Sequence, residues 1–145
     1  MNATIEKFGF PATRVAEFEH WIVLARPAQA TLGALVLAAK SEATAFGDLP
    51  PGAHAELAQA SAAIEAALGA FVGYERINYL MLMMVDPHVH FHVIPRYEGS
   101  RTWNGTRFED AGWPGVPDLG QAVRLADIDG AALVAALAKA FAPPA

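Results

Sequence analysis

Polar and apolar side chains alternate along residues 86–97, and this stretch organises our interpretation of the whole chain. A histidine occupies every second position, at His88, His90 and His92, and apolar residues fill the positions between them. Successive side chains of a β-strand point to opposite faces. The pattern therefore predicts a strand that presents three imidazoles on one face and its apolar side chains to the core. A proline on each side of the run fits a strand that ends there.

The apolar pattern elsewhere predicts three further strands and two helices. Runs of β-branched and apolar residues indicate strands at 19–25, 33–39 and 76–85. Apolar side chains recur every three or four residues over 53–72 and over 127–141, which is typical of helices that bury one side. The short connection between the first two strands favours an adjacent antiparallel pair.

Residues 98–126 follow neither pattern. This stretch is rich in glycine and proline and also contains Trp103, Phe108 and Trp113. Loops of this length in compact domains are usually functional or disordered, and the aromatic side chains argue against disorder. We expect an ordered loop that is pinned to the body, lines a ligand pocket or contacts another subunit. No repeat or second domain is visible, so we expect a single domain over 1–145.

The composition restricts the class of protein. With 145 residues, of which 54% are hydrophobic, the chain can bury the core of one domain. The absence of cysteine excludes disulfides and thiolate metal sites, and a net charge of −5 argues against broad attachment to nucleic acid. No apolar run reaches membrane-spanning length, and the N-terminus lacks the apolar region of a secretory signal. We therefore expect a cytoplasmic protein without membrane attachment.

Three imidazoles on one strand face have three interpretations. They could be a solvent-facing coincidence. They could bind a metal ion, but three side chains of one straight strand reach a single ion with difficulty, so a further ligand such as His20, Glu19 or Asp86 would be needed. They could also catalyse group transfer, because neutral imidazole is a good nucleophile toward phosphorus. His90 is then the natural nucleophile, since both neighbours can reach the same phosphate.

The run from His88 to Ile94 matches the motif His-φ-His-φ-His-φ-φ, where φ is apolar, and by this motif the chain resembles the histidine triad (HIT) superfamily. Residues 33–40 are similar to a strand of that family that begins with glycine and ends with lysine. The helix at 53–72 also lies where the family has one. The resemblance covers about residues 17–97. The Asp-Pro before the triad and the Pro-Arg-Tyr after it look like a bacterial subgroup of diadenosine tetraphosphate hydrolase-like proteins.

The resemblance implies an α+β fold with an antiparallel sheet of about five strands and two main helices, usually in a homodimer. It implies a nucleotide hydrolase or transferase that acts at an α-phosphate. The substrate would be a small-molecule nucleotide, such as a dinucleoside polyphosphate or a nucleoside phosphoramidate. By position, His90 is the nucleophile that forms a nucleotidyl-histidine intermediate, and His88 and His92 bind and polarise phosphate oxygens. The resemblance implies no cofactor and no metal at the triad.

The chain departs from the family pattern near the triad. Ala34 stands where the family has a strand histidine, and Ala39 stands where it has the proline before lysine. The family's Gly-Gln-Ser/Thr segment is replaced by Met83, Met84 and Val85. We expect other polar side chains to contact phosphate, and the candidates are Asn78, Arg96, Lys40 and Arg101.

These departures keep open a non-catalytic nucleotide-binding protein on the same fold. A metal-dependent hydrolase is a further alternative, because the histidines could also be ligands. The base, the leaving group, and the roles of His20 and of residues 98–126 do not follow from the sequence.

Overall fold

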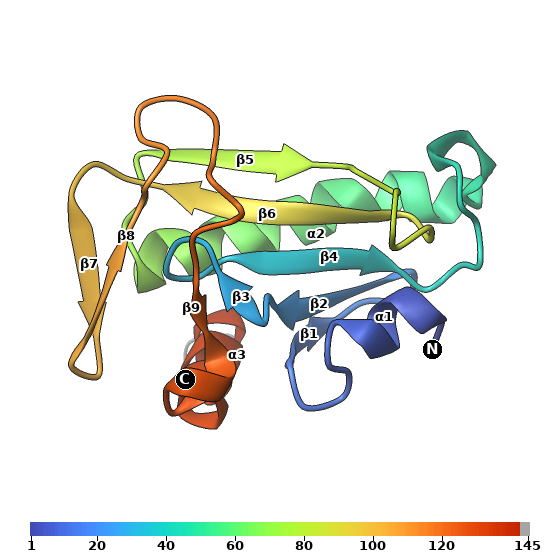
Figure 1. The fold of residues 1–145 in the computed structure, drawn as a ribbon. Coiled ribbons are helices and arrows are strands. Elements are labelled where there is room, and N and C mark those ends of the chain that lie inside the picture. The colour runs from blue at the N-terminus through green and yellow to red at the C-terminus, as the bar shows by residue number, and fades with distance from the viewer. Residues whose placement is uncertain (143–145) are drawn as a thin grey trace.

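A five-stranded antiparallel sheet forms the centre of the molecule in the computed structural model, which describes residues 1–142. The last three residues of the expected domain lie outside the described residues. Across the sheet the strands lie in the order β1-β2-β4-β6-β5, and each pair of neighbours is antiparallel (Figure 1). Their bounds are Arg14–Glu17 for β1, Trp21–Ala25 for β2, Leu35–Ala39 for β4, Arg76–Leu80 for β5 and His90–Arg96 for β6. The expected α+β fold is confirmed.

The other elements cover the sheet or extend from its ends. The helices are α1 (Ala3–Lys7), α2 (Pro51–Phe71) and α3 (Gly130–Phe141), with 3₁₀ turns η1 (Phe46–Asp48) and η2 (Leu125–Asp127). The short strands β3 (Ala28–Gln29) and β9 (Val123–Arg124) pair with each other, as do β7 (Ser100–Trp103) and β8 (Thr106–Glu109). The sequence predicted α2 and α3. In the part of the chain described, no helix is long and apolar enough to cross a membrane.

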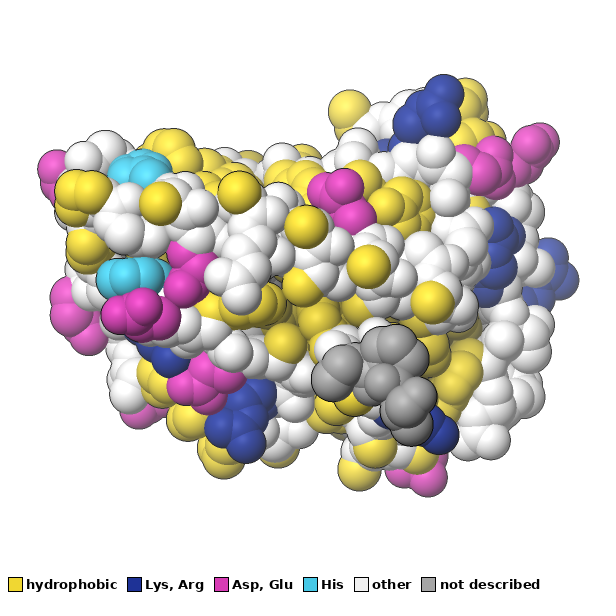
Figure 2. Space-filling model, turned by 180° about the vertical axis from the view of Figure 1, so that it is seen from behind, with side chains coloured by type: hydrophobic (Ala, Val, Ile, Leu, Met, Phe, Trp, Pro, Cys, Tyr) yellow, Lys and Arg dark blue, Asp and Glu magenta, His cyan; other side chains and the backbone are white. Residues whose placement is uncertain are grey.

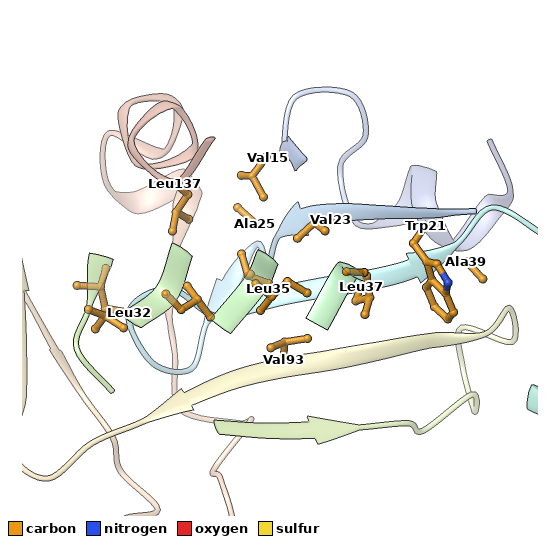
Figure 3. Close-up of a cluster of buried hydrophobic side chains, with 14 of the residues drawn as sticks. Val15, Trp21, Val23, Ala25, Leu32, Leu35, Leu37, Ala39, Val93 and Leu137 are labelled. Atoms are coloured by element: carbon orange, nitrogen blue, oxygen red, sulfur yellow. The ribbon is translucent and has the colours of Figure 1, made fainter. Parts of the chain in front are cut away.

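Helix α2 packs against one face of the sheet and encloses the main core (Figures 1 and 3). Ile64 and Leu68 of the helix are fully buried and join Leu35, Leu37 and Val93 of the strands in one apolar cluster. Burying each such side chain contributes roughly 1.5–3 kcal/mol. The alternate side chains of β6, which include two of the histidines, therefore face away from α2.

The N-terminal residues cover part of the opposite face, where α1 lies across the sheet from α2 (Figure 1). Ile5 is fully buried against Ile22 and Leu24 of β2. The Asn2 side chain caps the helix by accepting a hydrogen bond from the Ile5 N–H at 3.0 Å, and its amide donates to the Ala39 carbonyl at 2.9 Å. The sequence did not predict α1, because five residues are too few to show a helical period and tertiary contacts hold the helix in place.

Strand β6 begins later than the predicted histidine strand. It starts at His90, so His88 lies in the preceding loop. The backbone N–H of His88 donates to the Thr4 hydroxyl at 3.3 Å rather than to a neighbouring strand. Strand β5 also ends at Leu80 instead of residue 85, and residues 81–89 form the connection.

At its other end, β6 continues through Pro95 to Arg96. The pairing with β4 ends at Val93, so beyond that residue only β5 is hydrogen-bonded to β6. The Pro95 carbonyl faces away from β5 and accepts a hydrogen bond from the Thr31 hydroxyl at 2.7 Å. The Pro95 nitrogen, which has no N–H, therefore faces the side of β6 where β4 no longer pairs, so no hydrogen bond between strands is lost.

Residues 98–126 are not one irregular loop, because they contain the β7–β8 hairpin and β9. The hairpin turns at Asn104 and Gly105, whose φ angles of 48° and 78° are those that a two-residue turn of this kind requires. The Asn-Gly pair favours a hairpin turn. Its flanking strands have only four residues each, which is too short for a clear alternation of polar and apolar residues.

Charge is scattered over the face of the molecule that α2 covers. Figure 2 shows lysine and arginine side chains toward the rim of this face and acidic side chains between them, with apolar atoms exposed along the middle. A nucleic-acid interface needs lysine and arginine clustered on one face or along one helix. The described side chains visible on this face form no such cluster.

Candidate active site

His90, the first residue of β6, is oriented by the backbone just before it. Its ring Nδ1 lies 2.7 Å from the carbonyl oxygen of His88. A carbonyl oxygen can only accept, so Nδ1 carries the proton and Nε2 of the neutral ring carries the lone pair. The residue is 2% exposed. This orientation is the one that a nucleophilic imidazole requires.

His92 carries its proton on the opposite nitrogen. Nε of Arg26 donates to its Nδ1 at 3.1 Å, so the proton of the neutral ring lies on Nε2. Burial lowers the pKa of His92 to about 4, with further contributions from the Arg26 cation and from His90. The ring is therefore neutral at pH 7, and its Nε2–H is a hydrogen-bond donor.

The outer nitrogens of both rings face open space. Within residues 1–142, Nε2 of His90 and of His92 has no hydrogen-bond partner, yet no buried side-chain nitrogen or oxygen is left unbonded. Both residues line a cavity of about 250 Å³, whose other walls are Leu82–Asp86; we call it the histidine cavity. One lone pair and one N–H therefore face the same small space, an arrangement that suits attack on a phosphate and stabilisation of its charge.

His88 does not share the strand face of the other two histidines, so that prediction is wrong for this residue. Its Nδ1 lies 2.9 Å from the Thr4 hydroxyl, and its Nε2 lies 3.1 Å from the Glu42 carboxylate. The Glu42 carboxylate can only accept, so the proton of the neutral ring lies on Nε2 and the Thr4 hydroxyl donates to Nδ1. His88 thus orients His90 through its carbonyl, while its own ring is tied to α1.

Phe8 packs against both central imidazoles from the N-terminal segment. Its ring centre lies 5.5 Å from that of His90 and 5.7 Å from that of His92, whose own centres are 5.1 Å apart. Tilted and edge-to-face contacts of this kind restrict the ring orientations. The sequence did not point to Phe8, which lies some eighty positions before the triad.

A larger cavity of about 810 Å³, here called the outer cavity, lies farther along β5 and β6. Asn78, Arg96 and Trp113 line it. Arg96 is committed to protein contacts, because its Nε and Nη2 donate to the Asp110 carboxylate at 2.7 and 3.0 Å and its Nη1 donates to Asn78 at 2.8 Å. Since Arg96 and Asp110 are both buried, this ion pair holds the chain after β6 against the sheet.

Lys40 and Arg101 do not reach the histidine cavity. The Lys40 ammonium pairs with Glu17 at 2.7 Å. Arg101 donates to the Val72 carbonyl at 3.0 Å, next to the end of α2, and its guanidinium lies 4.5 Å from the centre of the Tyr97 ring. The structure therefore brings neither residue to the triad.

Three of the positions that depart from the family pattern line the histidine cavity, and Ala34 lies beside Arg26. Ala34 is fully buried, and its carbonyl accepts from the backbone N–H of Arg26 at 2.9 Å. Met83 lines the histidine cavity together with Met84 and Val85, both of which are 83% exposed. Apart from Asp86, the loop beside the candidate nucleophile is thus apolar. Arg26 is the polar residue bonded to His92 that sequence reasoning missed.

The two remaining histidines lie apart from the site. The backbone N–H of His20 donates to the Glu56 carboxylate at 2.7 Å, and the His54 ring packs edge-on against Phe46 with centres 4.8 Å apart. Among the described side chains, no group of three histidines, aspartates or glutamates could hold a metal ion. The metal-dependent alternative has no ligand set in this part of the chain.

Solved structures of other proteins share the fold of this chain. A histidine triad protein from Sinorhizobium meliloti matches with a TM-score of 0.72 at 21% identity, over 96% of this chain and 94% of that one. A histidine triad protein from Marinobacter aquaeolei matches at 0.66 and 20%, over 94% and 93%. A hypothetical histidine triad nucleotide-binding protein from Sulfolobus tokodaii matches at 0.66 and 17%, over 95% and 89%. The chain therefore has the histidine triad fold, as the motif predicted.

At the level of sequence, no protein-family model and no curated protein matches the chain. The structural likeness therefore establishes the fold, and it does not confirm the diadenosine tetraphosphate hydrolase-like subgroup. Activity and substrate depend on the geometry of the histidines and the cavities beside them.

Proposed function

We propose that this protein is a nucleotide hydrolase or transferase that acts at an α-phosphate through a nucleotidyl-histidine intermediate on His90. The observation that carries the proposal is the opposite proton placement of two neighbouring imidazoles. Nε2 of His90 has a lone pair, Nε2 of His92 has a proton, and both residues line the histidine cavity. A nucleotide as the ligand class is supported by the structural neighbour from Sulfolobus tokodaii, a hypothetical histidine triad nucleotide-binding protein.

The proposed reaction has two displacement steps at one phosphorus atom. Nε2 of His90 attacks the α-phosphorus, a P–N bond forms, and the bond to the leaving group breaks with its electron pair going to that group. The Nε2–H of His92 donates to a phosphoryl oxygen and stabilises its charge. The His88 carbonyl keeps the Nδ1 proton of His90 and stabilises the cationic ring. Water then attacks the phosphorus and loses one proton to solvent, and the P–N bond breaks with its electron pair returning to Nε2. The nucleoside monophosphate leaves, and His90 is again neutral.

The proposed substrates are dinucleoside polyphosphates or nucleoside phosphoramidates, and we assign the nucleoside to the outer cavity. Its volume of about 810 Å³ lies in the range of small-molecule sites. Trp113 offers a ring on which a base can stack, and Asn78 offers an amide. Arg96 lies four residues beyond His92 on β6, which corresponds to about 13 Å along a strand. A nucleotide can span this distance with its phosphate at the histidines and its base in the outer cavity. Arg96 then supports the cavity wall through Asp110.

The test is covalent trapping on His90. The protein is mixed with diadenosine tetraphosphate or adenosine phosphoramidate, quenched rapidly and examined by intact mass spectrometry. We expect a nucleotidyl adduct in the wild type and in the control variant His54→Ala. His90→Ala should show no adduct, and its turnover should fall by roughly 10³-fold or more. Full turnover in His90→Ala would rule out the mechanism.

A non-catalytic nucleotide-binding protein is the second candidate, and one observation favours it. The loop beside His90 offers the side chains of Met83, Met84 and Val85, none of which can protonate a leaving group. In that case calorimetry would detect binding of nucleoside monophosphate, and the rapid quench would yield no adduct from any substrate.

We also propose that the chain acts as a homodimer in the cytoplasm. In the described part of the chain, β5 is at the edge of the sheet and has a strand partner on one side only. The nearby side chains Leu82, Met84 and Val85 are 48%, 83% and 83% exposed. An open strand edge beside exposed apolar side chains is a common site of association between chains.

A further inference from the structure

The side chain of Arg26 crosses one strand of the sheet to reach His92. Arg26 follows β2 and lies opposite Ala34, to whose carbonyl it donates a backbone hydrogen bond. Two residues back, Leu24 pairs with Val36 of β4, and Val36 pairs in turn with His92 of β6. Neighbouring strands are about 4.8 Å apart, so the Arg26 side chain spans β4 to bond with a residue two strands away.

The size of the side chain at position 34 decides whether Arg26 can extend over β4 to His92. Residues opposite each other on neighbouring strands point their side chains to the same face, so the Ala34 side chain lies next to that of Arg26. Ala34 is fully buried, and its methyl group occupies little of the space over β4. A larger side chain here would compete with Arg26 for the space between β2 and β6.

The guanidinium group is held at two points. Its Nε donates to Nδ1 of His92 at 3.1 Å, and its Nη1 donates to the Ala28 carbonyl at 2.7 Å. Arginine stays protonated under all ordinary conditions and has no acceptor atom. Nδ1 of His92 therefore always faces a donor, and the proton of the neutral ring is always directed to Nε2.

We propose that Arg26 is a positioning residue of this site: it selects the Nε2–H tautomer of His92 and holds a permanent positive charge behind the ring that donates to phosphate. This inference depends on the proposed function for its catalytic consequence. The charge polarises the imidazole N–H, and a donor polarised in this way forms a stronger hydrogen bond to an anionic oxygen.

The first test examines His92 without any substrate. Nitrogen-15 NMR of the histidine rings reports the tautomer and the pKa of each ring. In the wild type we expect the Nε2–H form of His92 and a pKa of about 4. In Arg26→Met, which keeps a long apolar side chain but removes the donors and the charge, the Nδ1–H form should appear and the pKa should rise. An unchanged tautomer in Arg26→Met would overturn the proposal.

The second test measures the rate at which the nucleotidyl adduct forms on His90. Arg26→Met should slow this step about tenfold to a hundredfold, as is typical when a group that orients a functional imidazole is lost. Its affinity for nucleoside monophosphate should change much less. Arg26→Lys keeps the charge but shifts the donor, so it should be intermediate in both tests. An unchanged rate in both variants would contradict the catalytic part of the proposal.

Controls separate this inference from the proposed function. Arg124 is an exposed cation on β9, opposite Ala28, and Arg124→Met should leave the His92 tautomer and the adduct rate unchanged. If the wild type forms no adduct, the proposed function fails, and the NMR result still decides what Arg26 does to His92. Ala34→His tests whether a small side chain at position 34 is needed for Arg26 to reach His92. It should displace Arg26 and change the His92 tautomer in the same direction as Arg26→Met.

Discussion

His90 and His92 are the same residue type on one strand face, and they differ because their Nδ1 atoms meet different partners. Nδ1 of His90 meets a carbonyl from two residues earlier, which accepts, and Nδ1 of His92 meets a guanidinium from 66 residues earlier, which donates. The first partner follows from local backbone geometry. The second depends on how the strands are ordered, so the motif alone leaves the tautomer of His92 open.

We expect stability to fall as the pH drops from about 6.5 toward 4, because His92 resists protonation in the folded state. The unfolded chain takes up this proton near pH 6.5, whereas burial and Arg26 hold the folded pKa at about 4. The contribution of the neutral ring is fully present above pH 6.5 and is lost as the pH falls, by about 2 to 3 kcal/mol.

Urea unfolding of the wild type and of His92→Gln at pH 7 and pH 4.5 measures this contribution. The variant should lose less stability than the wild type between the two pH values, since glutamine does not titrate. Equal losses in both proteins would show that other groups cause the acid sensitivity.

At the scale of elements, the five-residue helix α1 holds the ring of His88. The Thr4 hydroxyl accepts from the backbone N–H of His88 and donates to its Nδ1. The His88 carbonyl in turn accepts from His90. The N-terminal segment thereby orients the candidate nucleophile through one intermediate residue.

Thr4→Val should slow formation of the His90 adduct severalfold, because an isosteric side chain without a hydroxyl leaves both bonds to His88 unmade. The free energy of unfolding should also decrease by about 1–3 kcal/mol, the usual cost of leaving buried polar groups without partners. Thr4→Ser keeps the hydroxyl and should retain the adduct rate. A Thr4→Val variant with the wild-type rate would exclude this role for α1.

The chain after β6 is held by a buried ion pair, which permits a test at the level of stability. Arg96→Met should lower the free energy of unfolding by about 3–5 kcal/mol, because Asp110 would remain buried without its cation. The matched control is Arg107→Met, whose pair with Glu109 is exposed on both sides and should cost less than about 1 kcal/mol. Chemical denaturation measures both variants, and equal losses would contradict the assigned role of Arg96.

At the scale of the whole molecule, the sheet has one covered edge and one open edge. Helix α3 packs beside β1, whereas β5 has a strand partner on one side only within the described chain, and residues 113–117 line the outer cavity with it (Figure 1). This asymmetry is the structural feature that supports association through the β5 side.

Light scattering after size-exclusion chromatography should give twice the chain mass of 15.4 kDa. Replacing exposed apolar residues near β5, as in Met84→Glu with Val85→Lys, should shift the protein toward the monomer, because charges in an apolar contact are desolvated without partners. Ala131→Glu is the control, since Ala131 is exposed on α3, which packs at the opposite edge of the sheet beside β1. A monomeric wild type would contradict the proposed dimer.

The fold class followed from the resemblance of the histidine motif to a known family, and local patterns were sufficient for two of the three imidazoles. The alternation of His90 and His92 with apolar residues predicts their shared face, because side-chain direction in a strand depends only on position. The helices α2 and α3 were predicted for the same reason, since their apolar period spans several turns.

Only the tertiary structure decided where His88, Arg96 and Arg26 act. His88 leaves the strand because a hydroxyl from α1 satisfies its backbone N–H, and Arg96 is held by an aspartate fourteen residues away. Arg26 reaches His92 because the strand order places β4, with a small residue at Ala34, between them. Contacts between side chains far apart in the sequence depend on packing and strand order, so no local pattern could have predicted them.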